Sequence, residues 1–240
     1  MPTGRADTVR GESKDADTAA LLGGAPLFVR AVDRLRAVAC HDATVLIEGE
    51  TGTGKELAAA AVHAMSCRAD QPFVAINCAA VPDTLIEDEL FGHARGAFTD
   101  AGQERLGLLQ AASRGTLCLD EIGSLSRRGQ ATLLRVLQDK SFRPLGSNAE
   151  QRTDARFIAL TNTALRDLVR ADQFRADLYF RLSVLPVRLP PLRERRDDIL
   201  MLTHHMHGPI WWLRRCRLAP RPCSSTATGP AMRVNSNTRS

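Results

Sequence analysis

A glycine-rich stretch at residues 49–56 holds the residues whose types and spacing best suit phosphate chemistry. It follows an apolar run at residues 44–47 and precedes an Ala-rich run at 57–65, which together predict a strand, a loop and a helix. Such a loop turns backbone N–H groups toward a phosphate chain, while the helix N-terminus and the Lys55 ammonium add positive potential. A nucleoside triphosphate is the predicted ligand, and the alternative is a Gly-rich turn that binds nothing. The expected binding residues are Gly49, Glu50, Thr51, Gly52, Thr53, Gly54, Lys55 and Glu56.

The acidic pair Asp120 and Glu121 supplies the second part of this chemistry. The general form of the loop has Ser or Thr after the lysine as a magnesium ligand, but Glu56 stands there, so the metal needs another partner. The acidic pair follows an apolar run at residues 116–119, and ligands of parallel sheets bind where strands end. We therefore expect Asp120 to hold Mg²⁺ through water and Glu121 to orient or deprotonate the attacking water. The alternative is a solvated acidic turn.

Alternating strands and helices must position these residues, and their order predicts an α/β fold with a parallel sheet. Apolar runs predict five strands, at residues 44–47, 73–76, 116–119, 156–160 and 184–189. Helical spacing predicts helices at residues 27–40, 57–65, 83–90, 129–139, 165–171 and 176–182. The second strand is expected to be buried, and the third helix to have Pro82 or Asp83 as its N-cap. Right-handed crossovers would place helices on both faces of the sheet.

Composition limits the other classes of function. With 240 residues and 44% hydrophobic content, the chain can bury one sizeable core. It has no apolar run long enough for a membrane span and no signal-peptide pattern, so we expect a cytoplasmic protein without membrane contact. The six cysteines form no CxxC pair, which favours reduced thiols. Residues 208–240 hold six arginines and no acid, so without them the net charge of +5 becomes −1 and the globular part is not basic.

Over residues 21–206 the chain resembles the AAA+ ATPase domain of bacterial sigma-54-dependent transcription activators. Residues 49–56 are similar to the Walker A motif of that family, which also has glutamate after the lysine, and residues 115–123 are similar to its Walker B motif. The resemblance implies a three-layer P-loop NTPase core with a parallel five-stranded sheet. It also implies ATP and Mg²⁺ as cofactors.

The same resemblance implies roles for residues outside the two Walker motifs. Asn77 matches the asparagine that restrains the Walker B glutamate, which suggests a switch between Asn77 and Glu121. Thr161 and Asn162 match sensor I, which is placed to report on the γ-phosphate. The remaining residues expected to contact ATP are Leu22 and Gly23.

Residues 174–182 are similar to the segment that holds the arginine fingers of the family, with Arg175 and Arg181 as the candidates. An arginine supplied by a neighbouring subunit implies self-assembly into a hexamer-like ring. A helix turns about 100° per residue, so the two arginines would point to different sides if the segment were helical throughout. At most one would then reach a neighbour's nucleotide, and the alternative for either is a surface salt bridge.

The loop at residues 96–101 resembles the GAFTGA loop, through which the family contacts the sigma-54 RNA polymerase holoenzyme. A Gly-flanked loop with one exposed Phe can offer an aromatic anchor to a partner and move with nucleotide state. The alternative is an ordinary buried Phe in a turn. Asp100 replaces the second glycine of the family, which adds a charge and removes backbone freedom. The expected partner-binding residues are Gly96, Ala97, Phe98, Thr99, Asp100 and Ala101.

We expect three segments: a disordered lead-in at residues 1–20, the ATPase domain at 21–206 and a tail at 207–240 unrelated to the family. The family continues with a helical lid that contains a Gly-Asn-x-Arg-Glu-Leu motif, and this lid is expected to be absent or disrupted. A shifted reading frame across residues 228–238 permits that motif, so we hypothesise a frameshift before the tail. Resequencing would test it. Without a later DNA-binding region, no sequence-specific DNA binding by this chain is expected.

Two functions follow from these observations. The first is an ATP-hydrolysing domain that remodels sigma-54 RNA polymerase to start transcription. The second is a truncated remnant that binds nucleotide or sigma-54 without turnover. A third, an AAA+ protein of the unfoldase or clamp-loader kind, is disfavoured by the loop at residues 96–101.

Overall fold

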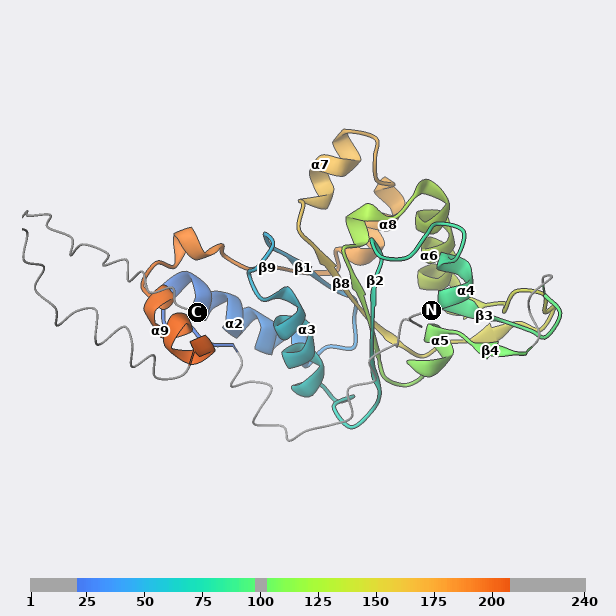
Figure 1. Ribbon diagram of the computed structural model, residues 1–240, viewed down its shortest axis with the longest axis horizontal. Coiled ribbons are helices and arrows are strands. Elements are labelled where there is room, and N and C mark those ends of the chain that lie inside the picture. Colours follow the sequence, from blue (N-terminus) through green and yellow to red (C-terminus); the bar gives the residue numbers. More distant parts are fainter. Residues whose placement is uncertain (1–20, 98–102, 208–240) are drawn as a thin grey trace, which may run out of the picture. The chain divides into compact units, whose positions relative to one another are not determined.

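The computed structural model describes residues 21–97 and 103–207, without the side chains of 205–207 (Figure 1). The chain divides into two units, Met1–Leu202 and Thr203–Ser240, and the described part of the second is the end of one helix. The predicted lead-in at residues 1–20, Phe98 to Ala101 of the predicted sigma-54 loop, and residues 208–240 with the expected loss of the lid lie outside the described residues.

A five-stranded parallel sheet forms the centre of the first unit. Its strands, in the order in which they lie side by side, are β2 (Phe73–Asn77), β5 (Thr116–Asp120), β8 (Arg156–Thr161), β1 (Val45–Glu48) and β9 (Leu185–Arg188). All four neighbouring pairs are parallel, so all five strands end at one edge of the sheet. All five strands predicted from the sequence are confirmed, and so is the predicted parallel sheet.

Strand residues alternate between two hydrophobic clusters, one on each face of the sheet. From the three central strands, the first cluster includes Leu46, Leu117, Leu119, Phe157 and Ala159. The second takes Val45, Ile47, Cys118, Ile158 and Leu160. Because successive strand side chains point to opposite faces, the central strands are apolar almost throughout. The sheet is therefore the middle layer of three.

The helices cover both faces. Two of them, α2 (Pro26–Ala39) and α3 (Lys55–Ala64), pack on the second cluster. The others that contribute to the first cluster are α4 (Ile86–Phe91), α5 (Leu108–Ala111), α6 (Arg127–Asp139), α7 (Leu165–Arg170) and α8 (Ala176–Leu182). Figure 1 shows α2 and α3 on one side of the sheet and α4 and α6 on the other. No helix among the described residues is long and apolar enough to cross a membrane.

Three local predictions need correction. Strand β2 is not buried as expected: it is an edge strand, and Ala75 is exposed. Helix α4 begins at Ile86 rather than at Pro82 or Asp83, because the preceding residues form a turn in which Leu85 N–H donates to Pro82 O at 2.8 Å. No side chain caps the helix, and its first residue, Ile86, is buried in the first hydrophobic cluster.

The start of helix α6 also differs from the prediction. Helix α6 begins two residues before the prediction because Ser126 Oγ accepts the Gly129 N–H and caps the helix. Arg175 is the extended N-cap residue of α8 and not part of the helix. The helix predicted at residues 176–182 is therefore confirmed, and the condition under which Arg175 and Arg181 would point to different sides, a segment helical throughout, is not met.

Short elements complete the unit. Two antiparallel ribbons were not predicted from the sequence: β3 (Gly92–His93) with β4 (Arg105–Leu106), and β6 (Ser141–Phe142) with β7 (Gln151–Arg152). Two 3₁₀ turns, η1 (Ile122–Ser124) and η2 (Leu192–Glu194), follow β5 and β9, and the helix α9 (Asp198–His207) comes last. The four cysteines of the described residues are free, and burial raises the pKa of the thiols of Cys78 and Cys118.

Candidate nucleotide site

The glycine loop lies between β1 and α3, as the sequence predicted. Gly52 has a φ of 78° and Gly54 a φ of 92°, which is the left-handed region that favours glycine. A Cβ at either position would meet open space, so backbone conformation rather than crowding requires glycine there. Gly54 is also the N-cap of α3, so the loop leads directly into the positive end of a helix dipole.

Hydrogen bonds within the loop converge on the carbonyl oxygen of Glu50. It accepts from Thr53 Oγ1 at 2.7 Å, from Thr53 N at 3.3 Å and from Lys55 Nζ at 3.1 Å. At the start of the loop, Gly49 N–H donates to Thr161 O at 3.1 Å and continues the bonding between β1 and β8. The loop is thus closed on itself and attached to the centre of the sheet.

The acidic pair lies where β5 ends, beside the glycine loop. Asp120 is the last residue of the strand, and its Oδ1 accepts the Glu121 N–H at 2.9 Å. Glu121 has a φ of 51° and starts the turn η1, in which Ser124 Oγ donates to Glu121 O at 2.7 Å. A left-handed non-glycine residue stores backbone strain, which is concentrated at functional sites in proteins.

One cavity unites the two motifs. It has a volume of about 340 Å³ and is lined by Thr51, Gly52, Gly54, Lys55, Glu56, Leu57, Asp120 and Glu121. The predicted meeting of Lys55 and Asp120 at one edge of the sheet is therefore confirmed. The cavity brings backbone N–H groups and an ammonium together with three carboxylates, which is a suitable lining for a phosphate chain and a cation.

The donor set of this cavity fits Mg²⁺. Glu56, Asp120 and Glu121 offer carboxylate oxygens, the ligands that Mg²⁺ prefers. No cluster of three or more His, Cys, Asp or Glu side chains in metal-binding geometry occurs among the described residues. Mg²⁺ usually keeps several waters and binds one or two carboxylates plus substrate phosphates, so a cluster of three such side chains is not required for it.

Three further expected site residues lie at the same sheet edge but do not line the cavity. Asn77 ends β2 and is the register partner of Asp120. Its Oδ1 accepts the Ala79 N–H at 2.9 Å. Thr161 ends β8 and is buried, and its hydroxyl donates to Thr163 O at 2.7 Å. The next residue, Asn162, accepts the Thr163 hydroxyl at 3.1 Å.

The two candidate arginine fingers differ in their surroundings. Arg175 forms an ion pair with Asp177 of its own chain, with 2.7 Å between Nη2 and Oδ2. Its backbone N–H donates to Oε1 of Gln130, which is fully buried. Arg181 lies in the last turn of α8 and is exposed. The side chain of Arg175 is thus paired with a neighbouring residue at the surface, and Arg181 is exposed.

The stems of the predicted sigma-54 loop are described, although its centre is not. A network centred on the buried Asp88 joins them: His93 Nδ1 lies 2.6 Å from Asp88 Oδ1, and the exposed Arg105 donates from Nη1 to Asp88 Oδ2 at 3.2 Å. Ala97 lies so close to Gly146 that a Cβ on that glycine would be 2.6 Å from the Ala97 Cβ. The ribbon β3–β4 and the residues after β6 therefore fix both ends of the loop.

Sequence reasoning missed a group of charged residues after β9 that contact the glycine loop and the chain before α2. Arg193 pairs with Glu50, and Arg195 donates to Thr53 O at 3.1 Å. Asp198 Oδ1 accepts the backbone N–H groups of Gly24 and Ala25. A run of charges among prolines at residues 190–199 was visible in the sequence, but it did not indicate which of these residues would be buried.

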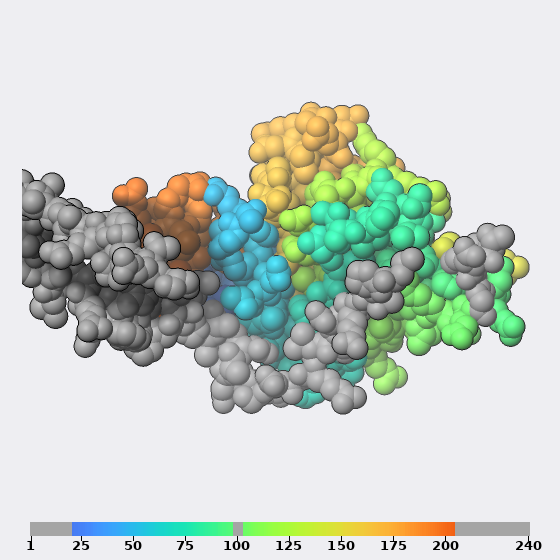
Figure 2. Space-filling model, in the orientation of Figure 1, coloured from blue at the N-terminus to red at the C-terminus, as the bar shows by residue number. Residues whose placement is uncertain are grey.

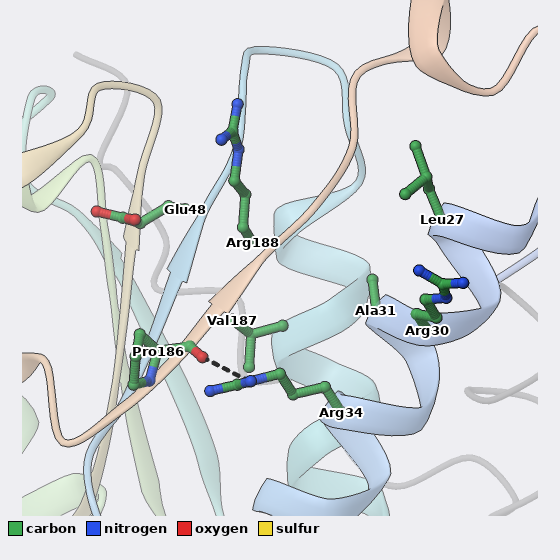
Figure 3. A pocket seen from close by; sticks show the side chains of 8 residues that line it. All are labelled: Leu27, Arg30, Ala31, Arg34, Glu48, Pro186, Val187 and Arg188. Carbon is green, nitrogen blue, oxygen red and sulfur yellow. Dashed lines mark hydrogen bonds between the residues drawn. The ribbon is translucent and has the colours of Figure 1, made fainter.

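A second cavity, of about 310 Å³, lies between α2 and β9 (Figure 3). It includes Arg30, Arg34, Glu48 and Arg188, and Arg34 Nε donates to Pro186 O at 2.9 Å. Its lining contains none of the glycine-loop residues that line the first cavity. The first cavity is therefore the candidate nucleotide site, because it is the one of these two that the glycine loop and the acidic pair line.

A five-stranded parallel sheet with helices on both faces, together with a phosphate-binding loop and an acidic pair at the carboxyl ends of its strands, defines a P-loop NTPase core of the AAA+ type. Residues 21–188 match the family described as the sigma-54 interaction domain. The chain belongs to this family of AAA+ ATPase domains, which confirms the resemblance drawn from the motifs.

Relatives agree with this assignment. The chain is 50% identical to the Nif-specific regulatory protein of Bradyrhizobium diazoefficiens over 80% of its own length and 33% of that protein. It is 49% identical to the transcriptional regulatory protein GlrR of Escherichia coli over 78% of its length and 42% of that protein. The chain thus spans about a third to two fifths of these relatives.

Among solved structures, NtrX from Brucella abortus in complex with ATP is similar to this chain with a TM-score of 0.72 and 36% identity. The match covers 77% of this chain and 42% of NtrX. NtrX has also been solved in complex with ADP, and that structure matches with a TM-score of 0.70. These likenesses confirm the predicted fold class.

Proposed function

We propose that this chain binds ATP with Mg²⁺ and hydrolyses it to remodel the sigma-54 RNA polymerase holoenzyme. The observation that supports this most is the single cavity lined by both the glycine loop and the acidic pair Asp120 and Glu121. Membership of the family of sigma-54 interaction domains supports the partner. The curated relatives are longer proteins, and this chain spans about a third to two fifths of their length.

Each residue of the cavity has a separate task in the proposal. Lys55 and the loop N–H groups bind the β- and γ-phosphates, and Asp120 holds the cation through water. Bound Mg²⁺ would supply charge neutralisation for the phosphate oxygens. Glu121 orients the attacking water and accepts its proton. Thr161 and Asn162 contact the γ-phosphate side, and Asn77 restrains Glu121 until the partner is engaged.

Two contacts outside the cavity complete the proposal. Arg181 reaches the ATP of a neighbouring subunit in a ring, because it is exposed at the end of α8 while Arg175 is paired with Asp177. The loop at residues 96–101 contacts sigma-54, supported at its stems by the network of Asp88. No sequence-specific contact with DNA is proposed for this chain.

The proposal is tested by the ATPase rate and the ATP affinity of the purified chain and of two variants. Lys55→Ala should lose ATP affinity because it removes the ammonium at the phosphates. Glu121→Gln should keep ATP affinity and lose turnover by at least about a hundredfold, as expected for loss of a general base. Glu150→Gln, an exposed glutamate far from the cavity in sequence, is the control.

Three outcomes are distinguished. A turnover that Lys55→Ala and Glu121→Gln abolish supports hydrolysis by this site. ATP binding without turnover in the unmodified chain contradicts hydrolysis and favours the alternative of a remnant that binds nucleotide only. For the partner, promoter opening by sigma-54 RNA polymerase with ATP should require Phe98, so equal opening by the unmodified chain and Phe98→Ala would reject the loop contact.

A further inference from the structure

A junction between three segments lies beside the glycine loop. Arg195 donates from Nη2 to the backbone oxygen of Thr53 at 3.1 Å, and its guanidinium carbon lies 4.3 Å from the ring centre of Phe28 on α2. Asp198 Oδ1 accepts the backbone N–H groups of Gly24 at 2.7 Å and Ala25 at 2.9 Å. Arg195 thus binds the backbone of the glycine loop, and Asp198 binds the backbone directly after Leu22 and Gly23, the expected ATP contacts.

Arg195 and Asp198 lie in one turn of the chain. Asp198 N–H donates to Arg195 O at 3.0 Å, which fixes the spacing between the two side chains. Arg195 is 4% exposed and Asp198 is 1% exposed. The hydrogen bonds to Thr53 and Ala25 are buried, and the one to Gly24 is partly buried. Hydrogen bonds from a charged group are stronger than neutral ones, and shielding strengthens them further.

Glycine is required at position 23 by the same junction. A Cβ on Gly23 would lie 2.2 Å from Cδ1 of Phe28 and 2.7 Å from Oδ2 of Asp198. Any larger residue must displace the ring that Arg195 covers or the carboxylate that holds the next two residues. The chain at residues 22–25 is therefore packed directly against the charged pair.

Burial of the charged pair Arg195 and Asp198 has a desolvation cost. Within the described residues, Arg195 Nε and Asp198 Oδ2 are buried without a hydrogen-bond partner. Burial lowers the pKa of Arg195, which the nearby Asp198 partly offsets. Apolar residues of similar size would avoid this desolvation cost. Apolar side chains could not form the hydrogen bonds to these two backbone segments, whereas Arg195 and Asp198 do.

We propose that Arg195 and Asp198 are positioning residues for the nucleotide, a proposal that rests on the proposed ATP site. Arg195 fixes the glycine loop through Thr53 and so sets the binding of the phosphates. Asp198 fixes residues 22–25, which include the expected ATP contacts outside the phosphate loop, and so sets the binding of the adenosine part. The two residues should therefore affect different ligands.

The test compares two ligands and two pairs of variants in the full chain. Dissociation constants for ATP and for inorganic tripolyphosphate, each with Mg²⁺, are measured by displacement of a fluorescent ATP analogue. Arg195→Ala should weaken both ligands by about tenfold, the effect of losing a hydrogen bond to a charged group. Asp198→Ala should weaken ATP by about tenfold and tripolyphosphate by less than about twofold.

Adjacent residues give matched controls. Arg196 and Asp197 are exposed neighbours of the pair, so Arg196→Ala and Asp197→Ala should bind both ligands like the unmodified chain. Asp198→Asn keeps an acceptor oxygen for the two N–H groups and should restore ATP affinity. Thermal unfolding identifies any variant that does not fold. If Arg195→Ala does not fold, Arg195→Lys replaces it. If Asp198→Ala does not fold, Gly23→Ala replaces it and should weaken the binding of ATP but not that of tripolyphosphate.

The outcomes separate the proposals. An unmodified chain that binds ATP while the alanine variants match their controls would overturn the positioning role and leave the proposed ATP site intact. Equal weakening of both ligands by both variants, in proportion to lost thermal stability, would also overturn it, because a general structural role predicts that result. An unmodified chain that binds neither ligand would overturn the proposed function itself.

Discussion

Arg193 and Glu50 form a bidentate ion pair at the glycine loop, with 2.6 Å between Nη2 and Oε1 and a second hydrogen bond from Nη1 to Oε2. The guanidinium of Arg193 lowers the pKa of the Glu50 carboxyl. Figure 2 shows the orange residues around η2 beside the blue residues of the glycine loop. Glu50, a carboxylate within the phosphate-binding loop, is thus paired with an arginine 143 positions later in the chain.

Loss of this ion pair should weaken ATP binding by electrostatic repulsion. Arg193→Ala leaves the negative charge of Glu50 beside a triphosphate, and we expect the dissociation constant for ATP to rise by about threefold to tenfold at low salt. The double variant Glu50→Gln with Arg193→Ala should recover most of the loss. The effect should shrink in high salt, so a salt-independent loss in titration calorimetry would contradict this explanation.

The left-handed conformation of Gly54 should be necessary for the loop. Gly54→Ala places a Cβ at a φ of 92°, which costs about 1–2 kcal/mol and favours a different loop conformation. We expect a loss of ATP affinity of about fivefold to thirtyfold, which is the equivalent of that energy. Gly129→Ala, in the first turn of α6, is the control: its backbone is not left-handed, and its added Cβ would lie 3.3 Å from Leu125 Cδ2, so it tests tight packing without changing the glycine loop. Unchanged ATP affinity in Gly54→Ala would rule out the backbone cradle.

Arg181 should act on the ATP of a neighbouring subunit. Arg181→Ala and Glu121→Gln are each expected to be inactive alone, since every site lacks either the arginine or the base. An equimolar mixture forms sites that combine an intact Glu121 with an intact Arg181 at random, about a quarter of all sites if the arginine acts across a subunit boundary. The ATPase rate of the mixture should recover to about that fraction. If the mixture stays inactive, Arg181 acts on the ATP of its own subunit and the prediction is wrong.

The acid stability of the domain should depend on Asp42. A hydrogen bond from Arg68 lowers the pKa of its carboxyl below the ordinary 3.8. A carboxyl with a lowered folded-state pKa stabilises the fold above its unfolded-state pKa, and this stabilisation is lost as the pH falls through the folded-state value. Asp42→Asn should therefore lower the free energy of unfolding by up to about 1 kcal/mol at neutral pH, the upper range for a partly exposed ion pair.

Urea unfolding over a pH series tests this prediction. The difference between Asp42→Asn and the unmodified chain should narrow as the pH falls below 3.8, because both then lack the carboxylate. Asp33→Asn, from an exposed pair with Arg36, is the control and should have little effect at any pH. A difference that stays constant down to acid pH would show that the Asp42 charge does not contribute.

Much of the fold and half of the site were predictable because their signals are local. Each central strand is an apolar run between turn residues, and parallel strands place their carboxyl ends at one edge whatever the crossovers contain. The meeting of Lys55 with Asp120 followed from that rule alone. Predictions that depended on burial were less accurate: the sequence of β2 does not indicate that it is an edge strand, and the start of α4 followed packing rather than a capping residue.

The sequence by itself determined that this chain has a phosphate-binding loop, an acidic pair and a parallel sheet, because short-range spacing and strand order suffice for all three. Only the tertiary structure decided what surrounds the loop. The contacts of Glu50 with Arg193 and of Thr53 with Arg195 join residues 143 and 142 positions apart. No local pattern encodes such pairs, since which charged residues become buried partners depends on how distant segments pack.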